Sequence, residues 1–161
     1  MKAKQIFQLI GSIILCQLAG LLGSLFTIGA IDGWYQALNK PFFNPPSWLF
    51  GPVWTMLYTL MGVAFYLLWT RTPKLFKRNE SKNLVFLFLI HLVFNAIWSP
   101  IFFGLHQIAF ALVIIIVMVI SLTYIMYKAW NIDRRVTYIL IPYLAWILFA
   151  SILNLALLIL N

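Results

Sequence analysis

The sequence predicts an all-α membrane protein, a bundle of five transmembrane helices, from its composition and from the spacing of its charges. Hydrophobic residues make up 64% of the 161 residues and charged residues 9%, which leaves too little polar surface for a soluble domain. The charges bound uncharged runs that reach the about 20 apolar residues needed to cross a bilayer. The longest run, between Lys82 and Lys128, is broken near residues 104–107 and supplies two helices. We predict one domain, 1–161, with helices at about 5–30, 48–69, 83–103, 107–127 and 136–159.

The first predicted helix, 5–30, is too long for the apolar core of a signal peptide, so we expect it to remain part of the protein. Small residues at Ser12, Cys16, Gly20 and Ser24 repeat every four positions and therefore share one face of the helix. Such a face lets another membrane helix approach closely. We interpret it as a packing groove, within the subunit or between subunits. The alternative is that Ser24, at its outer end, lines a ligand pocket.

The connector at 31–47 is expected to be a stiff loop. Pro41, Pro45 and Pro46 each fix φ and remove a backbone donor. The loop leads directly into the second predicted helix, whose first turns are rich in aromatic residues. We therefore expect the connector to act as a lid over a pocket at this junction.

The second helix, 48–69, carries an aromatic stripe that includes Trp54, Tyr58 and Trp69 at helical spacing. Stripes of this kind more often pack against helices or lie at the lipid interface than bind a ligand. The interface interpretation suits Trp69, which precedes the next basic loop. Trp54 follows a Gly-Pro pair, where an opened helix with freed backbone groups leaves room for a ligand. Trp54 is therefore a candidate site residue.

The third helix, 83–103, holds the main polar group at membrane depth. His91, Asn95, Trp98 and Phe102 share one of its faces, and ionisable residues inside a membrane usually point inward. We expect His91 to be a neutral imidazole that forms a hydrogen bond with a neighbouring helix, with a functional role as the alternative. Asn95 and Trp98 are expected to line the pocket, and the proline that follows them marks a local distortion near its mouth.

The last two helices contribute fewer candidates. The fourth, 107–127, consists mostly of Val, Ile and Leu, which is typical of a helix that faces lipid or a second subunit, and Phe110 near its outer end is a candidate for the pocket. In the fifth, 136–159, Trp146 and Ala150 are four residues apart and share a face. An alanine beside indole rings leaves a space in which a flat molecule can lie.

The basic charge of the chain does not indicate a nucleic-acid partner. The net charge is +8, but ten of the eleven basic residues fall on one side of a five-helix topology, and Lys40 alone falls on the other. By the positive-inside rule this predicts a multi-pass membrane protein with a cytoplasmic N-terminus and an external connector. The cytoplasmic charges are expected to attract anionic membrane lipid.

No catalytic or metal-binding set is recognisable in the sequence. The three acids, Asp32, Glu80 and Asp133, all lie in predicted loops, and no Cys/His group has the spacing of a metal site. What remains is an apolar pocket with indole walls, which suits flat, mostly apolar ligands such as a porphyrin. Lys40, on the outer side, is expected either to meet a carboxylate of that ligand or to donate to carbonyl groups at a helix end.

Ordered motifs in this chain resemble those of the tryptophan-rich sensory protein family, whose members are also called translocator proteins or peripheral-type benzodiazepine receptors. One group of motifs lies between residues 34 and 62, and two later groups extend the likeness to residue 154. The matching residues are Trp34-Tyr35, Leu38, Lys40-Pro41, Pro45-Pro46, Pro52-Val53-Trp54, Leu57-Tyr58, Met61-Gly62, Asn95, Trp98, Ile101-Phe102-Phe103-Gly104, Pro142-Tyr143, Trp146, Phe149-Ala150 and Leu153-Asn154.

The resemblance, which is to a bacterial-type member, implies a homodimeric protein of the bacterial cell membrane. Such a protein binds porphyrins such as protoporphyrin IX or haem, accepts benzodiazepine-site ligands and requires no cofactor. The leading hypothesis is a tetrapyrrole-binding sensor or regulator. One alternative is a transporter of porphyrins or other small hydrophobic molecules, which the lack of an acid in the predicted helices disfavours. Another is light-dependent porphyrin degradation, with Trp54 and Trp146 as electron donors. The expected ligand-binding residues are Ser24, Lys40, Phe50, Val53, Trp54, Tyr58, Asn95, Trp98, Phe110, Trp146, Ala150 and Leu153.

Overall fold

The computed structural model describes residues 3–31, 33–75 and 78–161, and the side chains at 71–75 and 78–81 lie outside this description. Almost all of the described chain is helical, and these ranges contain no β-strand. The predicted fold class, an all-α membrane bundle of five long helices, is confirmed. The elements are α1 (Ala3–Ile31), α2 (Trp34–Ala37), α3 (Ser47–Leu75), α4 (Arg78–Ser99), the π-helical turn η1 (Pro100–Gly104), α5 (Ile108–Trp130) and α6 (Arg134–Leu160).

Five segments of the described chain have the length and composition of membrane spans. The shortest of them contain 23 residues, which extend for about 35 Å at the helical rise of about 1.5 Å per residue. This exceeds the about 30 Å thickness of a bilayer's hydrocarbon core. The segments are Ala3–Ile31, Ser47–Thr70, Lys82–Gly104, Ile108–Trp130 and Arg134–Leu160.

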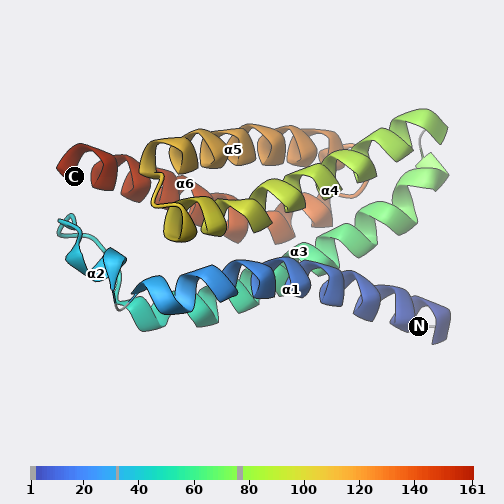
Figure 1. Ribbon diagram of the computed structural model, residues 1–161. Coiled ribbons are helices and arrows are strands. Elements are labelled where there is room, and N and C mark those ends of the chain that lie inside the picture. Colours follow the sequence, from blue (N-terminus) through green and yellow to red (C-terminus); the bar gives the residue numbers. More distant parts are fainter. Residues whose placement is uncertain (1–2, 32, 76–77) are drawn as a thin grey trace.

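The five long helices run lengthwise through the bundle (Figure 1), and their contacts close into a ring. α1 lies beside α3 and α4, α6 lies beside α3 and α5, and α4 contacts α5, so the order around the ring is α1, α3, α6, α5, α4. The N-terminal end of α1 and the junction of α3 with α4 lie at one end of the bundle. α2 and the last residues of α6 lie at the other end, which we call the connector end because it carries the connector 33–46.

The small-residue face of α1 packs against α3 inside the subunit, and Cys16 on this face is fully buried. A Cβ atom built on Gly20 would lie 2.3 Å from the ring of Tyr58, and one built on Gly62 of α3 would lie 2.5 Å from Cα of Ile13. Neither position has room for a side chain, so the two helices approach closely because glycine occupies both. The interpretation of this face as a packing groove is confirmed for contacts within the subunit.

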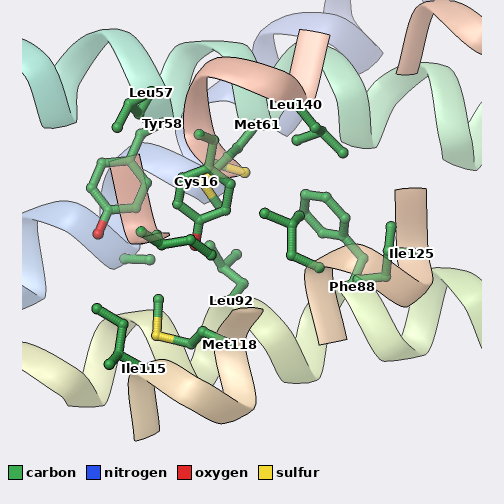
Figure 2. Packing of buried hydrophobic residues seen from close by; sticks show 14 of the residues in the cluster. Cys16, Leu57, Tyr58, Met61, Phe88, Leu92, Ile115, Met118, Ile125 and Leu140 are labelled. Atoms are coloured by element: carbon green, nitrogen blue, oxygen red, sulfur yellow. The ribbon is translucent and has the colours of Figure 1, made fainter. Parts of the chain in front are cut away.

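The apolar core occupies the middle of the bundle, and every long helix contributes to it (Figure 2). Cys16 of α1, Met61 of α3, Phe88 of α4, Met118 of α5 and Leu140 of α6 are each at most 1% exposed. Lipid is as apolar as these side chains, so the close packing contributes through dispersion contacts rather than through removal of the side chains from water. The core holds the helices at fixed distances below the connector end.

Three local features shape the connector end: the turn η1, the chain reversal after it and the short helix α2. α4 continues into η1, the distortion expected at Pro100, and the Leu105 N–H donates to the Pro100 carbonyl across this wider turn at 2.9 Å. His106 then reverses the chain with a φ of 56°. The connector, expected to be a loop over 31–47, contains the short helix α2. Together these turns bring the aromatic residues of η1 against those of α2.

Candidate functional site

A cavity of about 350 Å³ extends from the connector end toward the middle of the bundle. All five long helices, η1 and α2 contribute to its lining. Aromatic and aliphatic side chains predominate in the lining, and polar groups are few. The volume lies at the lower end of the about 300–1,000 Å³ range of small-molecule pockets, so the cavity is large enough for a compact, mostly apolar ligand.

Three indole rings line this cavity, one each from α3, α4 and α6. Trp54 is stacked against Tyr58 with ring centroids 5.4 Å apart, and Trp98 is stacked against Phe102 at 5.0 Å. Rings held by neighbouring rings keep one orientation. The cavity therefore presents aromatic surface whose direction is set before a ligand arrives.

The third indole, Trp146, shares a face of α6 with Ala150, and both residues line the cavity. Trp146 contacts Phe50 of α3 at 6.2 Å and Phe149 at 5.6 Å between ring centroids. Ala150 offers only a methyl group one turn further along the helix. This combination leaves free space directly beside an aromatic wall, as the sequence predicted.

A chain of hydrogen bonds leads from the cavity wall into the bundle. Tyr58 donates to Oδ1 of Asn95, and Nδ2 of Asn95 donates to the Tyr143 hydroxyl at 2.7 Å. The Tyr143 hydroxyl lies 2.8 Å from Nε2 of His91, whose Nδ1 lies 2.8 Å from Oγ of Ser121. The chain joins α3, α4, α5 and α6. The predicted hydrogen bonding of His91 to neighbouring helices is confirmed.

In this chain each residue donates a hydrogen bond to the next, in the order Tyr58, Asn95, Tyr143, His91 and Ser121. Ser121 Oγ donates to the Met118 carbonyl at 3.1 Å, so Nδ1 of His91 carries the proton and donates to Ser121. Nε2 of His91 then accepts from Tyr143. Because both amide atoms of Asn95 have a partner, the network stabilises the bundle, and the second N–H of this amide is the one donor that the network does not use.

Three buried polar atoms in the lining have no hydrogen-bond partner within the described residues: Nε1 of Trp98, and Nδ2 and Oδ1 of Asn154. Asn154, on α6, is 1% exposed. Buried polar groups are normally paired, so these three atoms retain unused hydrogen-bonding capacity. Sequence reasoning identified Trp98 but missed Asn154 as a site residue, although an asparagine inside a membrane helix is itself a signal.

The α1 side of the cavity presents mainly apolar surface because its hydroxyl groups are already used. Ser24 donates to the Leu21 carbonyl at 2.8 Å. The hydroxyls of Thr27 and Ser99 lie 2.6 Å apart, and Ser99 donates to the Gly23 carbonyl at 2.9 Å. These bonds join α1 to α4 at the level of the cavity. Ser24 lines the cavity, as expected, with its hydroxyl turned to the backbone.

Ring contacts hold α2 against η1 and the turn after it. Trp34 stacks on His106 with centroids 4.3 Å apart, and Tyr35 contacts Phe103 at 5.5 Å. Tyr35 is 3% exposed and donates to Oδ1 of Asn44 at 2.6 Å. Burial raises the pKa of Tyr35 from 10 to about 12, so its hydroxyl stays protonated and keeps donating this bond even in moderately alkaline solution.

The rest of the connector is joined to the end of α6. The Asn161 side chain accepts from the Asn39 N–H at 2.9 Å and donates to the Asn39 carbonyl at 3.1 Å. Lys40 donates to the Gln36 carbonyl at 2.8 Å, and its ammonium lies 5.2 Å from the centre of the Tyr35 ring. Lys40 was expected either to meet a ligand carboxylate or to donate to a carbonyl at a helix end. The structure shows the second of these contacts.

Most of the expected ligand-binding residues line one cavity, and three lie outside its lining: Lys40, Val53 and Phe110. Phe110 is 54% exposed on the outer face of α5, which reaches the cavity through Ile115 and Met118 instead. Val53 packs against the core, because successive residues of a helix point about 100° apart and Trp54 faces the cavity. The residues brought together are Ser24, Phe50, Trp54, Tyr58, Asn95, Trp98, Trp146, Ala150 and Leu153.

The chemistry that the cavity offers comes from its rings and from the three unpartnered polar atoms. Within the part of the chain that the structure describes, no three His, Cys, Asp or Glu side chains are grouped as a metal site would require. The indoles supply stacking surface, and the indole and phenol rings are also oxidisable. An arrangement of this kind can bind a flat ligand and exchange an electron with it.

Comparisons with known proteins give consistent similarities. The model of the TspO/MBR family matches residues 12–160. A tryptophan-rich protein TspO from Archaeoglobus fulgidus is 39% identical over 160 residues, which cover 97% of this chain and 98% of that protein. A tryptophan-rich protein TspO from Chlorobaculum tepidum is 40% identical over 98% of both chains. A translocator protein from Bos taurus is 34% identical over 90% of this chain and 85% of its own.

Proposed function

Since this chain, an integral multi-pass membrane protein, belongs to the TspO/MBR family, we propose that it is a sensor or regulator that binds a porphyrin-type tetrapyrrole in the cavity at the connector end. Protoporphyrin IX and haem are the ligands that we propose, and benzodiazepine-site ligands would compete for the same space. Binding of the ligand in the cavity would change the contacts that the connector makes with η1 and α6.

One observation carries this proposal: three indole rings and Ala150 surround a single apolar cavity. A porphyrin is a broad π-system, and each aromatic pair that it forms contributes about 0.5–1.5 kcal/mol beyond the burial of its area. In the pose that we propose, one edge of the macrocycle projects beyond the lining of this cavity. We place the ionised carboxylates on that edge, toward the aqueous phase and within reach of Lys40 at the connector end.

The orientation in the membrane follows from the charges. Within the part of the chain that the structure describes, every basic residue except Lys40 belongs to the end that holds the N-terminus and the α3–α4 and α5–α6 junctions. The positive-inside rule supports a cytoplasmic position for that end and an external position for the connector. The bacterial cell membrane is the location that we propose. A ligand would then enter the cavity from the external side or from the outer half of the bilayer.

A homodimer is the assembly that we propose. The outward faces of α1 and α5 expose large apolar side chains, among them Phe7, Leu25 and Ile120, and such faces suit either lipid or a second subunit. Cys16 is buried against α3, so a disulfide through Cys16 would not join the two copies. Crosslinking in membranes through lysine residues is the appropriate test.

A second function, light-dependent porphyrin degradation, is favoured by the ring contacts of Trp54. This indole lines the cavity, stacks on Tyr58 and meets Tyr143 edge-on at 6.4 Å. Trp146 faces the same space. An excited porphyrin held there would oxidise the nearest indole, and the reduced macrocycle could then react with oxygen.

Titration of protoporphyrin IX into the purified protein in lipid nanodiscs tests the proposed function. We expect saturable quenching of tryptophan fluorescence together with a shifted porphyrin absorption band, since the ring would lie within contact distance of the indoles. Absence of saturable binding would overturn the proposal. Uptake of the porphyrin into sealed liposomes that contain the protein would instead support the transporter alternative.

A further inference from the structure

The cavity contains two asparagines in opposite hydrogen-bonding states. Asn95 uses Oδ1 to accept from Tyr58 and Nδ2 to donate to Tyr143. Asn154 is just as deeply buried, at 1% exposed, and neither atom of its amide has a partner in the described residues. An unpaired buried amide destabilises a protein unless something completes its hydrogen bonds. Asn95 is therefore structural, and Asn154 is available.

A second unpartnered polar group belongs to a lining residue of another helix. Nε1 of Trp98 on α4 is buried without an acceptor, and both Trp98 and Asn154 line the cavity. Stacking on Phe102, with the ring planes 14° apart, fixes the direction of the indole N–H. The aliphatic side chains of Leu153 and Leu157 adjoin Asn154 on α6 and also line the cavity. In such apolar surroundings a hydrogen bond to a ligand is stronger than in water.

The chemistry of these groups defines the ligand that satisfies them. A carboxamide offers one acceptor oxygen and two N–H donors. A ligand group pairs with both of its ends when it carries a donor and an acceptor on neighbouring atoms. The C=O and N–H of a cyclic secondary amide point the same way and form two parallel bonds with it. An ionised carboxylate has acceptors only and would place negative charge beside Oδ1 of Asn154. An indole N–H requires one further acceptor.

We propose that Asn154 and Trp98 form the polar anchor of the cavity, and that the cavity selects flat, mostly apolar ligands with a cyclic secondary amide at the edge. Asn154 pairs with the amide C=O and N–H, and Trp98 donates to an acceptor of the same ligand. This inference goes beyond the proposed function: protoporphyrin IX carries no cyclic amide, so the anchor assigns a second class of ligand to the same cavity. It also gives the ligand a direction, with the neutral amide edge at the anchor and any ionised group toward the aqueous phase.

A matched pair of probes tests the anchor: phenanthridin-6(5H)-one, a flat cyclic amide, and its N-methyl derivative, which keeps the carbonyl but lacks the N–H. In lipid nanodiscs the wild-type protein should bind the N–H compound about tenfold more tightly, as expected for one buried hydrogen bond and its unsatisfied acceptor. Asn154→Leu should bring this ratio close to one. Trp98→Phe keeps a stacking ring, so it should weaken both probes by about the same factor.

The control for these variants is Ser151→Ala. Ser151 lies on the same helix, is absent from the lining, and donates to the Ile147 carbonyl at 2.7 Å, so its removal should leave both affinities unchanged. Asn154→Leu removes an unpaired amide, and its thermal unfolding midpoint should be equal to or above that of the wild type. A clear decrease in that midpoint would show that Asn154 has a structural partner and would overturn the anchor.

Equal affinity of the wild-type protein for the two probes would also overturn the anchor. That result would leave the proposed function standing if protoporphyrin IX still bound saturably. A preference for the N–H probe that Asn154→Leu removes, without saturable porphyrin binding, would support the anchor and reject the porphyrin as ligand. The two titrations therefore separate failure of the anchor from failure of the proposed function.

Discussion

At the scale of single residues, Trp54 and Trp146 combine exposure to the cavity with contacts to other aromatic rings. Trp54 lies 5.4 Å from Tyr58 and 6.4 Å from Tyr143 between ring centroids, and Trp146 lies 5.6 Å from Phe149. An indole is much easier to oxidise than a phenyl ring, although both stack on flat ligands. Substitution by phenylalanine therefore separates electron donation from binding.

We predict that Trp54→Phe or Trp146→Phe reduces light-driven loss of bound porphyrin by about tenfold or more. Porphyrin affinity should fall only about two- to fivefold, because the phenyl ring retains most of the stacking contribution. Decay of porphyrin absorbance under illumination measures the first effect, and fluorescence titration in the dark measures the second.

Trp69→Phe is the matched control, since Trp69 is 44% exposed and is not part of the lining. It should change neither quantity. Unaltered decay in both cavity variants would contradict electron donation by these indoles, and the sensor hypothesis would remain.

The residues of the site could be predicted where helical periodicity decides which way a side chain points. Trp146 and Ala150 are four positions apart, and both face the cavity. Phe110 could not be placed in this way, because the nearly uniform apolar sequence of α5 gives no sign of which face turns inward. Asn154 was missed for a different reason. Its lack of a partner depends on side chains of other helices and is invisible along the chain.

At the scale of secondary-structure elements, the contact between α1 and α3 depends on glycine. The backbone of Ile13 passes so close to Gly62 that a Cβ atom there would lie 2.5 Å from Cα and 2.9 Å from the nitrogen of that residue. Backbone atoms cannot move aside as the end of a flexible side chain can. A methyl group at this position must therefore push the helices apart.

We predict that Gly62→Ala destabilises the protein by about 1–3 kcal/mol, the usual cost of overpacking. Gly11→Ala is the matched control, because a Cβ at Gly11 meets nothing within 4 Å. Alanine is favoured over glycine in a helix by about 1 kcal/mol, so this variant should be equally or more stable. Thermal unfolding in a mild detergent measures both, and equal midpoints for the two variants would contradict the close approach.

The long helices could be predicted from the sequence because uncharged runs of sufficient length admit little else in a membrane. The short elements could not. α2 spans only Trp34–Ala37, too few residues for hydrophobic periodicity to appear, and it was expected to be loop. The distortion at Pro100 was anticipated, but its π-helical form depends on the Leu105 N–H reaching the Pro100 carbonyl, which only the packed structure determines.

At the scale of the whole molecule, charge and architecture coincide. The connector end holds the cavity and Lys40, while the other basic residues that the structure describes belong to the opposite end. The order of the helices around the ring could not be read from the sequence, because several outward faces are similarly apolar. That the two ends of the bundle differ in charge could be predicted from the sequence, because the positive charges are distributed so unequally along it.

The orientation predicts the labelling of single cysteines in intact cells. Asn44→Cys in the connector should react with a membrane-impermeant thiol reagent, and Asn131→Cys, between α5 and α6, should react only after the cells are opened. Cys16 is fully buried and should stay unlabelled in both cases. The opposite labelling pattern would reverse the topology and place the cavity at the cytoplasmic surface.

The central claim is that a porphyrin occupies the space between the indoles, and a larger side chain at Ala150 tests it most directly. Ala150 lines the cavity, whereas Ala145 on the same helix is exposed outside it. Dissociation constants for protoporphyrin IX should be measured in nanodiscs for Ala150→Phe and Ala145→Phe. We predict that Ala150→Phe weakens binding by about tenfold or more, because filling the space forces ring and ligand to overlap, and that Ala145→Phe leaves it unchanged. Unchanged affinity in folded Ala150→Phe would place the ligand elsewhere.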